Sequence, residues 1–486
     1  MKELKLDFVG ISRSESRRGT ISLTVNMSMR RTGENKDVVY YPAAGIAKAV
    51  EKFETPFFVY EEKRLRENCR NLKNAFTKYF PGVDGNGAFQ PLYAVKANSN
   101  PEVLKIIISE GFEFDASSDT EVILGEKLGV GGMFTGNYNP ASELKVAKDA
   151  GFILNLDDVS MLDFFEGAEA GAMSVPETLS FRINPGMGKS SIGLVFAGPD
   201  AKYGVPFEKA PEAYKRAKEM GVKHFGIHMM TGSNVPMEDK DYFANIVRKL
   251  FDIVAEIKNK TGIEIEFMNI GGGFGVPYKP EEKSLDMEVV AKSIRGAFDE
   301  KCKEHGLKEP RLMAEPGRFI TADAGWLVGK VILIKDSYKK FVGIDASSND
   351  MPRPSIYGAY HFVTLLIGSR RSEPAKPDSS LARARAVPSH VTSNVCDDSE
   401  KELVSIVGRI CENNDQLAQD RLLPKCEIGD IVLIHNSGGH AYAMGHNYNG
   451  RPRHAEYLLQ ENGELRMIRR AETFEDLYRT TDNRSS

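Results

Sequence analysis

Three reactive or charged side chains stand at the ends of short apolar runs in the sequence. Lys96 belongs to Leu-Tyr-Ala-Val-Lys-Ala-Asn, and Glu315 and Arg318 form Glu-Pro-Gly-Arg after a second run. A lysine that is partly desolvated at the end of a buried strand has a lowered pKa, which favours Schiff-base formation with an aldehyde. A carboxylate can pair with a pyridinium nitrogen, and a guanidinium can hold a phosphate oxygen. A surface lysine and a surface ion pair are the alternatives at these positions.

A glycine cluster, Gly271–Gly275 (Gly-Gly-Gly-Phe-Gly), follows a third apolar run. Residues without a Cβ let backbone N–H groups approach a phosphate closely, although a glycine cluster by itself is more often only a tight loop. The lysine, the glycine loop and the acid together supply the groups that pyridoxal 5'-phosphate requires. The sequence therefore predicts a site for this cofactor, without a metal ion.

The elements that must position these groups alternate along the chain between about residues 56 and 320. Short apolar runs alternate there with longer amphipathic, charge-rich segments, which is typical of a (β/α)8 barrel. An open doubly wound sheet is the alternative, but eight regular units fit it less well. The expected strands are Leu92–Val95, Phe112–Ala116, Met133–Gly136, Phe152–Leu156, Leu179–Ile183, His224–His228, Glu266–Ile270 and Leu312–Glu315. Polar and glycine residues gather at the carboxyl ends of these strands, where barrel enzymes place their active sites.

The sequence pattern of the rest of the chain is typical of an all-β domain. Strands separated by Gly, Pro, Asn and Asp turns are expected over Trp326–Lys335, Lys340–Asp345, Ile428–His435 and Glu464–Arg469, and also over Thr20–Met27 and Val38–Tyr41. We therefore expect an α/β plus all-β protein. Residues 56–319 would form the cofactor-binding, TIM-like (β/α)8 barrel. Residues 1–55 and 320–486 would form a separate β-sandwich or barrel domain, with 369–402 as a mobile surface insertion.

Composition excludes several classes of protein. The 486 residues carry a formal net charge of −4, which argues against nucleic acid as the main partner. No apolar run reaches the roughly 18 residues of a membrane span. The five cysteines are few and unclustered, so a reducing compartment, the cytoplasm, is expected.

Five ordered motifs resemble the fold-type III pyridoxal-phosphate decarboxylases, and among these the diaminopimelate decarboxylases, from about Tyr40 to Asp482. The motifs are Tyr93-Ala-Val-Lys-Ala-Asn98, Gly271-Gly-Gly-Phe-Gly275, Glu315-Pro-Gly-Arg318, Cys411-Glu-Asn-Asn-Asp415 and Asn447-Tyr-Asn-Gly-Arg-Pro-Arg453. The resemblance implies that Lys96 forms the Schiff base and that Glu315 keeps the pyridine nitrogen protonated. It places the phosphate on Ser233, Gly272, Gly273 and Arg318.

The resemblance also implies a homodimer in which the two subunits share their active sites. Cys411 and Glu412 would reach in from the partner, Cys411 to reprotonate the carbanion and Glu412 to hold the distal amine of the substrate. Arg353 and Tyr357 are similar to the family's substrate-carboxylate clamp, and Arg318 belongs with them among the substrate-binding residues. From its type alone Cys411 could equally be a buried small hydrophobic residue, and Cys396 lacks the family context.

Two positions depart from the family pattern. The family commonly has a histidine stacked on the cofactor ring where this chain has Met230, so His228, on the same face of the strand, is the candidate replacement. A core histidine is an equally good interpretation of His228. Where the family commonly has Gly-Ala-Tyr at the phosphate, this chain has Gly438-Gly-His440. His440 can donate to a phosphate, and Tyr442 is the second candidate.

The function that the resemblance implies is decarboxylation of meso-2,6-diaminopimelate to L-lysine and carbon dioxide, the last step of lysine biosynthesis. This substrate carries an amine and a carboxylate at its distal end, which Glu412 and Arg353 would recognise. The alternatives are a related decarboxylase acting on ornithine, lysine or a carboxylated polyamine, and a catalytically silent homologue. The silent homologue should lack Lys96 or Cys411, and both are present.

Overall fold

The computed structural model describes residues 42–82, 89–165, 173–186, 189–190, 197–239, 241–366 and 401–481. Eight parallel strands close into a barrel in the order β2-β3-β4-β5-β6-β9-β11-β12, with β12 pairing back to β2. The strands are β2 (Phe89–Ala94), β3 (Glu113–Ala116), β4 (Gly132–Phe134), β5 (Ile153–Leu156), β6 (Thr178–Asn184), β9 (His224–His228), β11 (Phe267–Asn269) and β12 (Arg311–Ala314). All eight expected strands are present, so the predicted barrel is confirmed.

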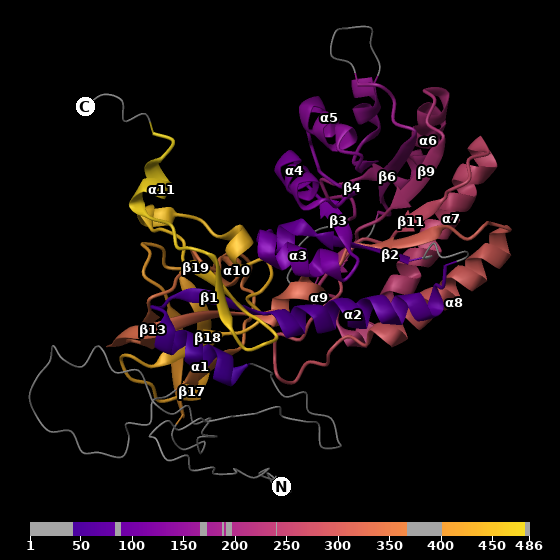
Figure 1. Cartoon of the computed structure of the whole chain (residues 1–486). Helices are drawn as coiled ribbons and strands as arrows, with labels where there is room; N and C mark the ends of the chain where they lie inside the picture. Colours follow the sequence, from indigo (N-terminus) through magenta and orange to yellow (C-terminus); the bar gives the residue numbers. More distant parts are fainter. Residues whose placement is uncertain are drawn as a thin grey trace, which may run out of the picture.

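The helices that follow the strands surround the barrel (Figure 1). They are α3 (Pro101–Ser109), α4 (Asp119–Leu128), α5 (Ala141–Asp149), α6 (Ala210–Glu219), α7 (Tyr242–Thr261) and α8 (Met287–His305). Local sequence fixes their first turns. Asn100 caps α3 ahead of Pro101, and Ser118 caps α4 by accepting the amide of Glu121. The helices cover the strands with apolar faces such as the one that α7 presents, so the barrel strands are buried on both sides.

The second part of the molecule is built on a nine-stranded mixed sheet. Its strands are β1 (Phe57–Glu61), β13 (Gly325–Asp336), β14 (Lys340–Ile344), β15 (Val363–Leu366), β16 (Lys401–Val407), β17 (Gln416–Pro424), β18 (Ile431–Ile434), β19 (Ala455–Leu459) and β20 (Leu465–Arg469). Helix α1 (Ala43–Lys52) packs on this sheet through Ile46 and Ala49, next to Trp326. The β domain expected after residue 320 is therefore confirmed.

One strand lies on the other side of the expected domain boundary. β1 pairs antiparallel with β13 and parallel with β19, so residues 57–61 are part of the β sheet and the barrel strands begin at Phe89. Helix α2 (Glu62–Tyr79) then runs from the β domain along the barrel, where it packs on α8 (Figure 1). The strands expected over 20–27 and 38–41 lie outside the described residues. Residues 369–400 of the expected insertion also lie outside the described residues, and residues 401–402 belong to β16. Apart from the position of β1, the division of the chain into two domains at residues 56 and 319 stays a prediction.

Within the described ranges, we find no helix both long enough and apolar enough to cross a bilayer.

A buried carboxylate ties the two domains together. Glu456, on β19, is fully buried and accepts hydrogen bonds from the Tyr60 hydroxyl (2.5 Å) and from Nδ2 of Asn100 (3.0 Å), the residue that caps barrel helix α3. It also pairs with Arg469 on β20. Desolvation and the negative charge of Glu456 raise the pKa of Tyr60 well above its usual value, so Tyr60 stays protonated and remains a donor.

We expect Glu456→Ala to lower the thermal unfolding midpoint by several degrees, because it leaves Tyr60, Asn100 and Arg469 without their shared acceptor. Breaking a buried charge pair from one side costs about 3 kcal/mol or more. Differential scanning calorimetry measures the change, and Glu464→Ala, at an exposed turn residue, is the control. Equal midpoints for the two variants would contradict this role.

Candidate active site

Lys96 lies directly after barrel strand β2, in the turn Val95–Ala97. Its Nζ donates to Oδ2 of Asp115 on β3 at 2.6 Å, and 49% of its side chain is exposed at the barrel mouth. Asp115 is fully buried and also accepts a hydrogen bond from the Thr135 hydroxyl. Sequence reasoning missed Asp115, although an acidic residue in the apolar strand Glu-Phe-Asp-Ala was a usable signal.

The pKa of Lys96 is raised, and the expectation of a lowered pKa is wrong. Burial acts to lower it, but the negative charges of Asp115 and Glu315 and the hydrogen bond to Asp115 together outweigh burial. The raised pKa keeps Lys96 an ammonium ion at neutral pH. It must lose a proton before its nitrogen can attack an aldehyde.

Glu315 follows barrel strand β12 and is buried. Its carboxylate accepts from Nδ2 of Asn269 at 2.8 Å and from Nε2 of His228 at 3.2 Å. Burial acts to raise the pKa of Glu315, but its interactions with His228, followed by the charges of Lys96 and Arg182, lower it to about 2. The side chain is thus a carboxylate at neutral pH, as pairing with a protonated ring nitrogen requires.

His228 and Met230 occupy different places. His228 is buried and directs Nε2 to Glu315, while its Nδ1 has no hydrogen-bond partner among the described residues. Met230 is half-buried, and its sulfur lies 3.2 Å from the amide nitrogen of Gly272 in the glycine loop. The structure therefore brings both residues to the site. Met230 lies against the glycine loop, and His228 lies beside the acid.

The glycine loop approaches neighbouring backbone so closely that side chains would not fit. Gly271 and Gly273 have φ of +68° and +94°. A Cβ on Gly272 would lie 2.4 Å from the carbonyl oxygen of Glu315, and one on Gly273 would lie 2.7 Å from that of Gly232. Ser233 is next to Gly232, so the predicted phosphate residues Ser233, Gly272 and Gly273 are brought together.

Two buried arginines meet at a tyrosine that sequence reasoning missed. Arg318 Nη1 donates to the Tyr278 hydroxyl at 2.5 Å, and Arg353 Nη1 donates to the same oxygen at 2.8 Å. Arg318 Nη2 lies 3.5 Å from the Ser233 hydroxyl, so this guanidinium faces both the glycine loop and Arg353. Tyr357 is half-buried one helical turn after Arg353, on the same helix, α10 (Arg353–Tyr357). The position of Tyr278, three residues after the loop Gly271–Gly275, was the only signal for it in the sequence.

His440 lies at the same site, whereas Tyr442 does not. The amide of His440 donates to the carbonyl of Ala97, beside Lys96, at 2.7 Å. Desolvation and the charges of Arg318, Arg353 and Lys96 hold the pKa of His440 well below its usual range, so the ring is neutral. The Tyr442 ring instead packs between the guanidiniums of Arg453 and Arg469, at 5.0 and 4.9 Å.

Cys411 and Glu412 are exposed, and no contact found among the described residues joins them to the Lys96 cluster of the same chain. The interpretation of Cys411 as a buried hydrophobic residue is therefore wrong. Its backbone is nevertheless held, since its amide donates to Oδ1 of Asn449 at 2.7 Å. Cys396 lies outside the described residues.

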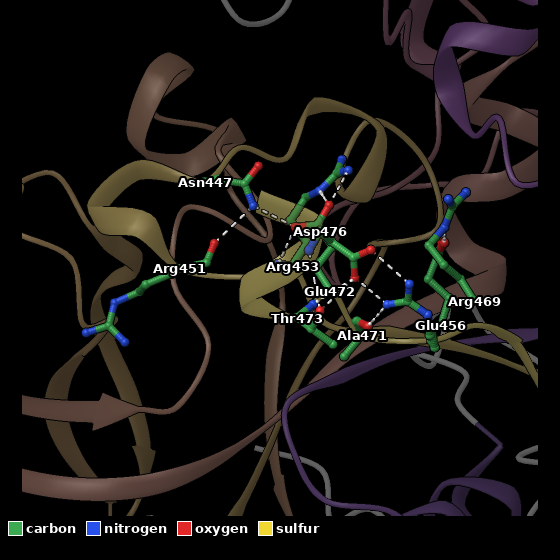
Figure 2. Close-up of polar contacts among 10 residues, drawn as sticks. Asn447, Arg451, Arg453, Glu456, Arg469, Ala471, Glu472, Thr473 and Asp476 are labelled. Atoms are coloured by element: carbon green, nitrogen blue, oxygen red, sulfur yellow. Dashed lines mark hydrogen bonds and ion pairs between the residues drawn. The ribbon is translucent and has the colours of Figure 1, made fainter. Parts of the chain in front are cut away.

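The segment that holds Cys411 is anchored in turn by Glu472. Figure 2 shows the Glu472 carboxylate accepting from Asn447 Nδ2 at 2.6 Å and from the guanidinium of Arg453. These two residues flank Asn449, and Arg451 in the same segment donates to the carbonyl of Arg409 at 3.0 Å. The Cys411 turn is thus exposed and is held in place by these hydrogen bonds.

The family was established by comparison with known proteins. A family model described as "Pyridoxal-dependent decarboxylase, pyridoxal binding domain" matches residues 63–322. The diaminopimelate decarboxylase of Methanothermobacter thermautotrophicus is 37% identical over 90% of this chain and 94% of its own length. The chain belongs to the diaminopimelate decarboxylase family.

Another solved structure and a further curated relative are similar to most of the chain. The Methanocaldococcus jannaschii diaminopimelate decarboxylase, solved with L-lysine, superposes with a TM-score of 0.74 at 31% identity, over 89% of this chain and 93% of that one. Protein TabA of Pseudomonas amygdali pv. tabaci is 33% identical over 87% of this chain and 90% of its own length.

The residues present fit pyridoxal phosphate. Lys96, the ionised Glu315 and the arginine beside Ser233 supply the amine, the acid and the phosphate-binding cation. A Cβ would not fit at Gly272 or Gly273, and within the described part of the chain the buried Nδ1 of His228 lacks a partner.

We expect Asp115→Asn to let Lys96 react with pyridoxal phosphate at lower pH than the wild type does. Removing the carboxylate lowers the pKa of Lys96, and only the neutral amine attacks the aldehyde. The measurement is the absorbance of the lysine-bound cofactor as a function of pH. Asp119→Asn, which removes a half-buried carboxylate at the start of α4, is the control. A profile that stays in place or moves to higher pH would disprove the assigned cause.

Proposed function

We propose that this enzyme decarboxylates meso-2,6-diaminopimelate to L-lysine and carbon dioxide, the last step of lysine biosynthesis. The observation that carries the proposal is the pair of buried guanidiniums, Arg318 and Arg353. They are 9% and 2% exposed, and among the described residues no carboxylate pairs with either. Buried charges without a counter-ion are costly. An anionic group of the substrate would supply the missing charge.

Pyridoxal phosphate is the cofactor, and when bound it withdraws the electrons that the departing carboxyl group leaves behind. The chain's own residues would bind and orient it. Lys96 would hold its aldehyde carbon, and the Glu315 carboxylate would hold a proton on its ring nitrogen. Ser233, Gly272, Gly273 and Nη2 of Arg318 would hold its phosphate, with His440 as a neutral donor beside them.

Substrate selection would depend on the distal carboxylate. Arg353 and Nη1 of Arg318 meet at the Tyr278 hydroxyl, while Nη2 of Arg318 lies towards Ser233, which suits a second anion beyond the phosphate. Ornithine and lysine have no distal carboxylate and would leave Arg353 without a counter-ion. In a carboxylated polyamine the carboxylate lies at another position of the molecule. Such a compound therefore tests whether the spacing between the reacting end and the distal carboxylate matters.

The homodimer and its shared active site are also part of this proposal. Cys411 and Glu412 are exposed on a turn held by hydrogen bonds, which suits residues that act in a neighbouring subunit. Tyr448, adjacent to Asn449, is a large apolar side chain that is 52% exposed on the same segment. A second copy of the chain would cover it.

We further place the reaction in the cytoplasm and expect no nucleic-acid partner. The four described cysteines are free, which suits a reducing compartment, and the net charge of −4 does not favour polyanions.

We expect the purified enzyme to release carbon dioxide from meso-2,6-diaminopimelate in preference to ornithine, lysine and a carboxylated polyamine. Arg353→Met should lower kcat/KM for diaminopimelate by about 100-fold, since it removes a buried charge-assisted contact. Released carbon dioxide is the readout, and Arg479→Met, at an exposed arginine, is the control. A preference for ornithine would overturn the proposed substrate.

We expect two inactive variants, Lys96→Ala and Cys411→Ala, to restore activity when their subunits are mixed. In mixed dimers one of the two sites would contain both intact residues, so random mixing should return about a quarter of wild-type activity. Unfolding and refolding the two variants together, with mass spectrometry to count mixed dimers, measures this. Mixed dimers without activity would show that the residues act in the same subunit.

A further inference from the structure

The Tyr278 side chain joins two cations that come from different domains. Arg318 is on helix α9 (Arg318–Thr321), after barrel strand β12, and Arg353 begins α10 in the β domain. Both guanidiniums lie near the Tyr278 ring, at 5.7 and 4.9 Å, and both donate to its hydroxyl oxygen. The tyrosine is 7% exposed. Tyr278 therefore holds two positively charged guanidiniums at one oxygen. Without this shared acceptor, the two guanidiniums would repel each other.

The backbone of Tyr278 is fixed from both sides. Its amide donates to the Glu282 carboxylate at 2.8 Å, and the carbonyl of Pro277 accepts from Nδ2 of Asn436 in the β domain at 2.7 Å. The ring also packs edge-on against His361, with the centroids 5.0 Å apart. The hydroxyl is thus preorganised and is not carried by a mobile loop.

The Tyr278 hydroxyl accepts two hydrogen bonds, and among the described residues it donates none. A phenol oxygen that accepts two hydrogen bonds still has its own proton to donate. No acceptor for that proton is found among the described residues. Arg353 directs the same Nη1 also to Nε2 of His361, whose Nδ1–H donates to the carbonyl of His435 at 2.8 Å. His361 is therefore a neutral acceptor and supplies no counter-charge.

We propose that Tyr278 determines specificity for a distal carboxylate, by holding Arg318 and Arg353 together and donating its hydroxyl proton to that carboxylate. Three donors from two domains would then converge on one anion. This inference rests on the proposed function. A substrate without the distal carboxylate would leave the Tyr278 proton without an acceptor and Arg353 without a counter-ion, which penalises it.

Charge around Tyr278 makes the proposed contact sensitive to pH. The ionisable groups that face it are Arg318, Arg353, the neutral His361 and the Glu282 carboxylate at its amide. Burial acts to raise the pKa of Tyr278, but the two guanidiniums outweigh burial and lower it below its usual value. As the pH rises through this pKa, the donor becomes a phenolate, which repels a carboxylate.

The test compares binding of two unreactive acids to the enzyme loaded with its cofactor. Pimelate has two carboxylates at the spacing of the proposed substrate, and hexanoate lacks the distal one. We expect Tyr278→Phe to weaken pimelate binding about tenfold in calorimetry, with hexanoate binding unchanged. The KM for diaminopimelate should rise while kcat changes little. Tyr338→Phe, at a fully exposed turn, is the matched control.

The outcomes separate the possible failures. Unchanged pimelate binding, or equal weakening of both acids, would overturn the role of Tyr278. If wild-type enzyme does not act on diaminopimelate while Tyr278→Phe still weakens pimelate selectively, the anion site stands and the proposed substrate is wrong. If Tyr278→Phe does not fold, the pH dependence of acid binding to the wild-type enzyme tests the proposal instead. Its pimelate affinity should fall at alkaline pH below the usual tyrosine range, while its hexanoate affinity does not, and parallel pH profiles would overturn the inference.

Discussion

The site depends on keeping a carboxylate ionised inside the mouth of the barrel. Burial opposes a charge on Glu315, and the protein overcomes this with Asn269, His228 and nearby cations. Each of these groups comes from a different strand end, so their convergence requires a closed barrel in correct register. The same requirement explains why Lys96 has its own buried carboxylate, Asp115, one strand away. Positive and negative side chains therefore compensate one another at the barrel mouth, and each of these side chains is positioned by a different strand.

The β domain contributes the second half of the anion-binding surface. Arg353 reaches the barrel residue Tyr278, and the amide of His440 reaches Ala97 beside Lys96. Glu456 secures the same junction at a distance from the chemistry, between Tyr60 and the cap of α3. The relative position of the domains is therefore part of the site, and a shift between them would separate Arg318 from Arg353.

Local pattern was sufficient to predict the eight barrel strands, because apolar runs and amphipathic segments are local properties. It also located Lys96, Glu315 and the glycine loop. It could not reveal the contacts that join Tyr278 to Arg353, because the two residues lie 75 positions apart and meet only through the packing of two domains. The direction of the Lys96 pKa was mispredicted for a related reason, since burial was considered without the carboxylates that accompany it. Strand β1 looks like any other apolar run, and only its partners β13 and β19 assign it to the other sheet.

The position of β1 has a consequence for how the chain can be assembled on the ribosome. The barrel strands lie in one continuous stretch, from Phe89 to Ala314, so their pairing partners leave the ribosome in succession. β1 leaves before all of them, yet one neighbour is β13 and the other, β19, begins only at Ala455. Long-range pairing of this kind is slow, and N-terminal units generally fold first during synthesis. The five residues Phe57–Glu61, all buried in the finished sheet, therefore cannot pair with their second neighbour until Ala455 has left the ribosome.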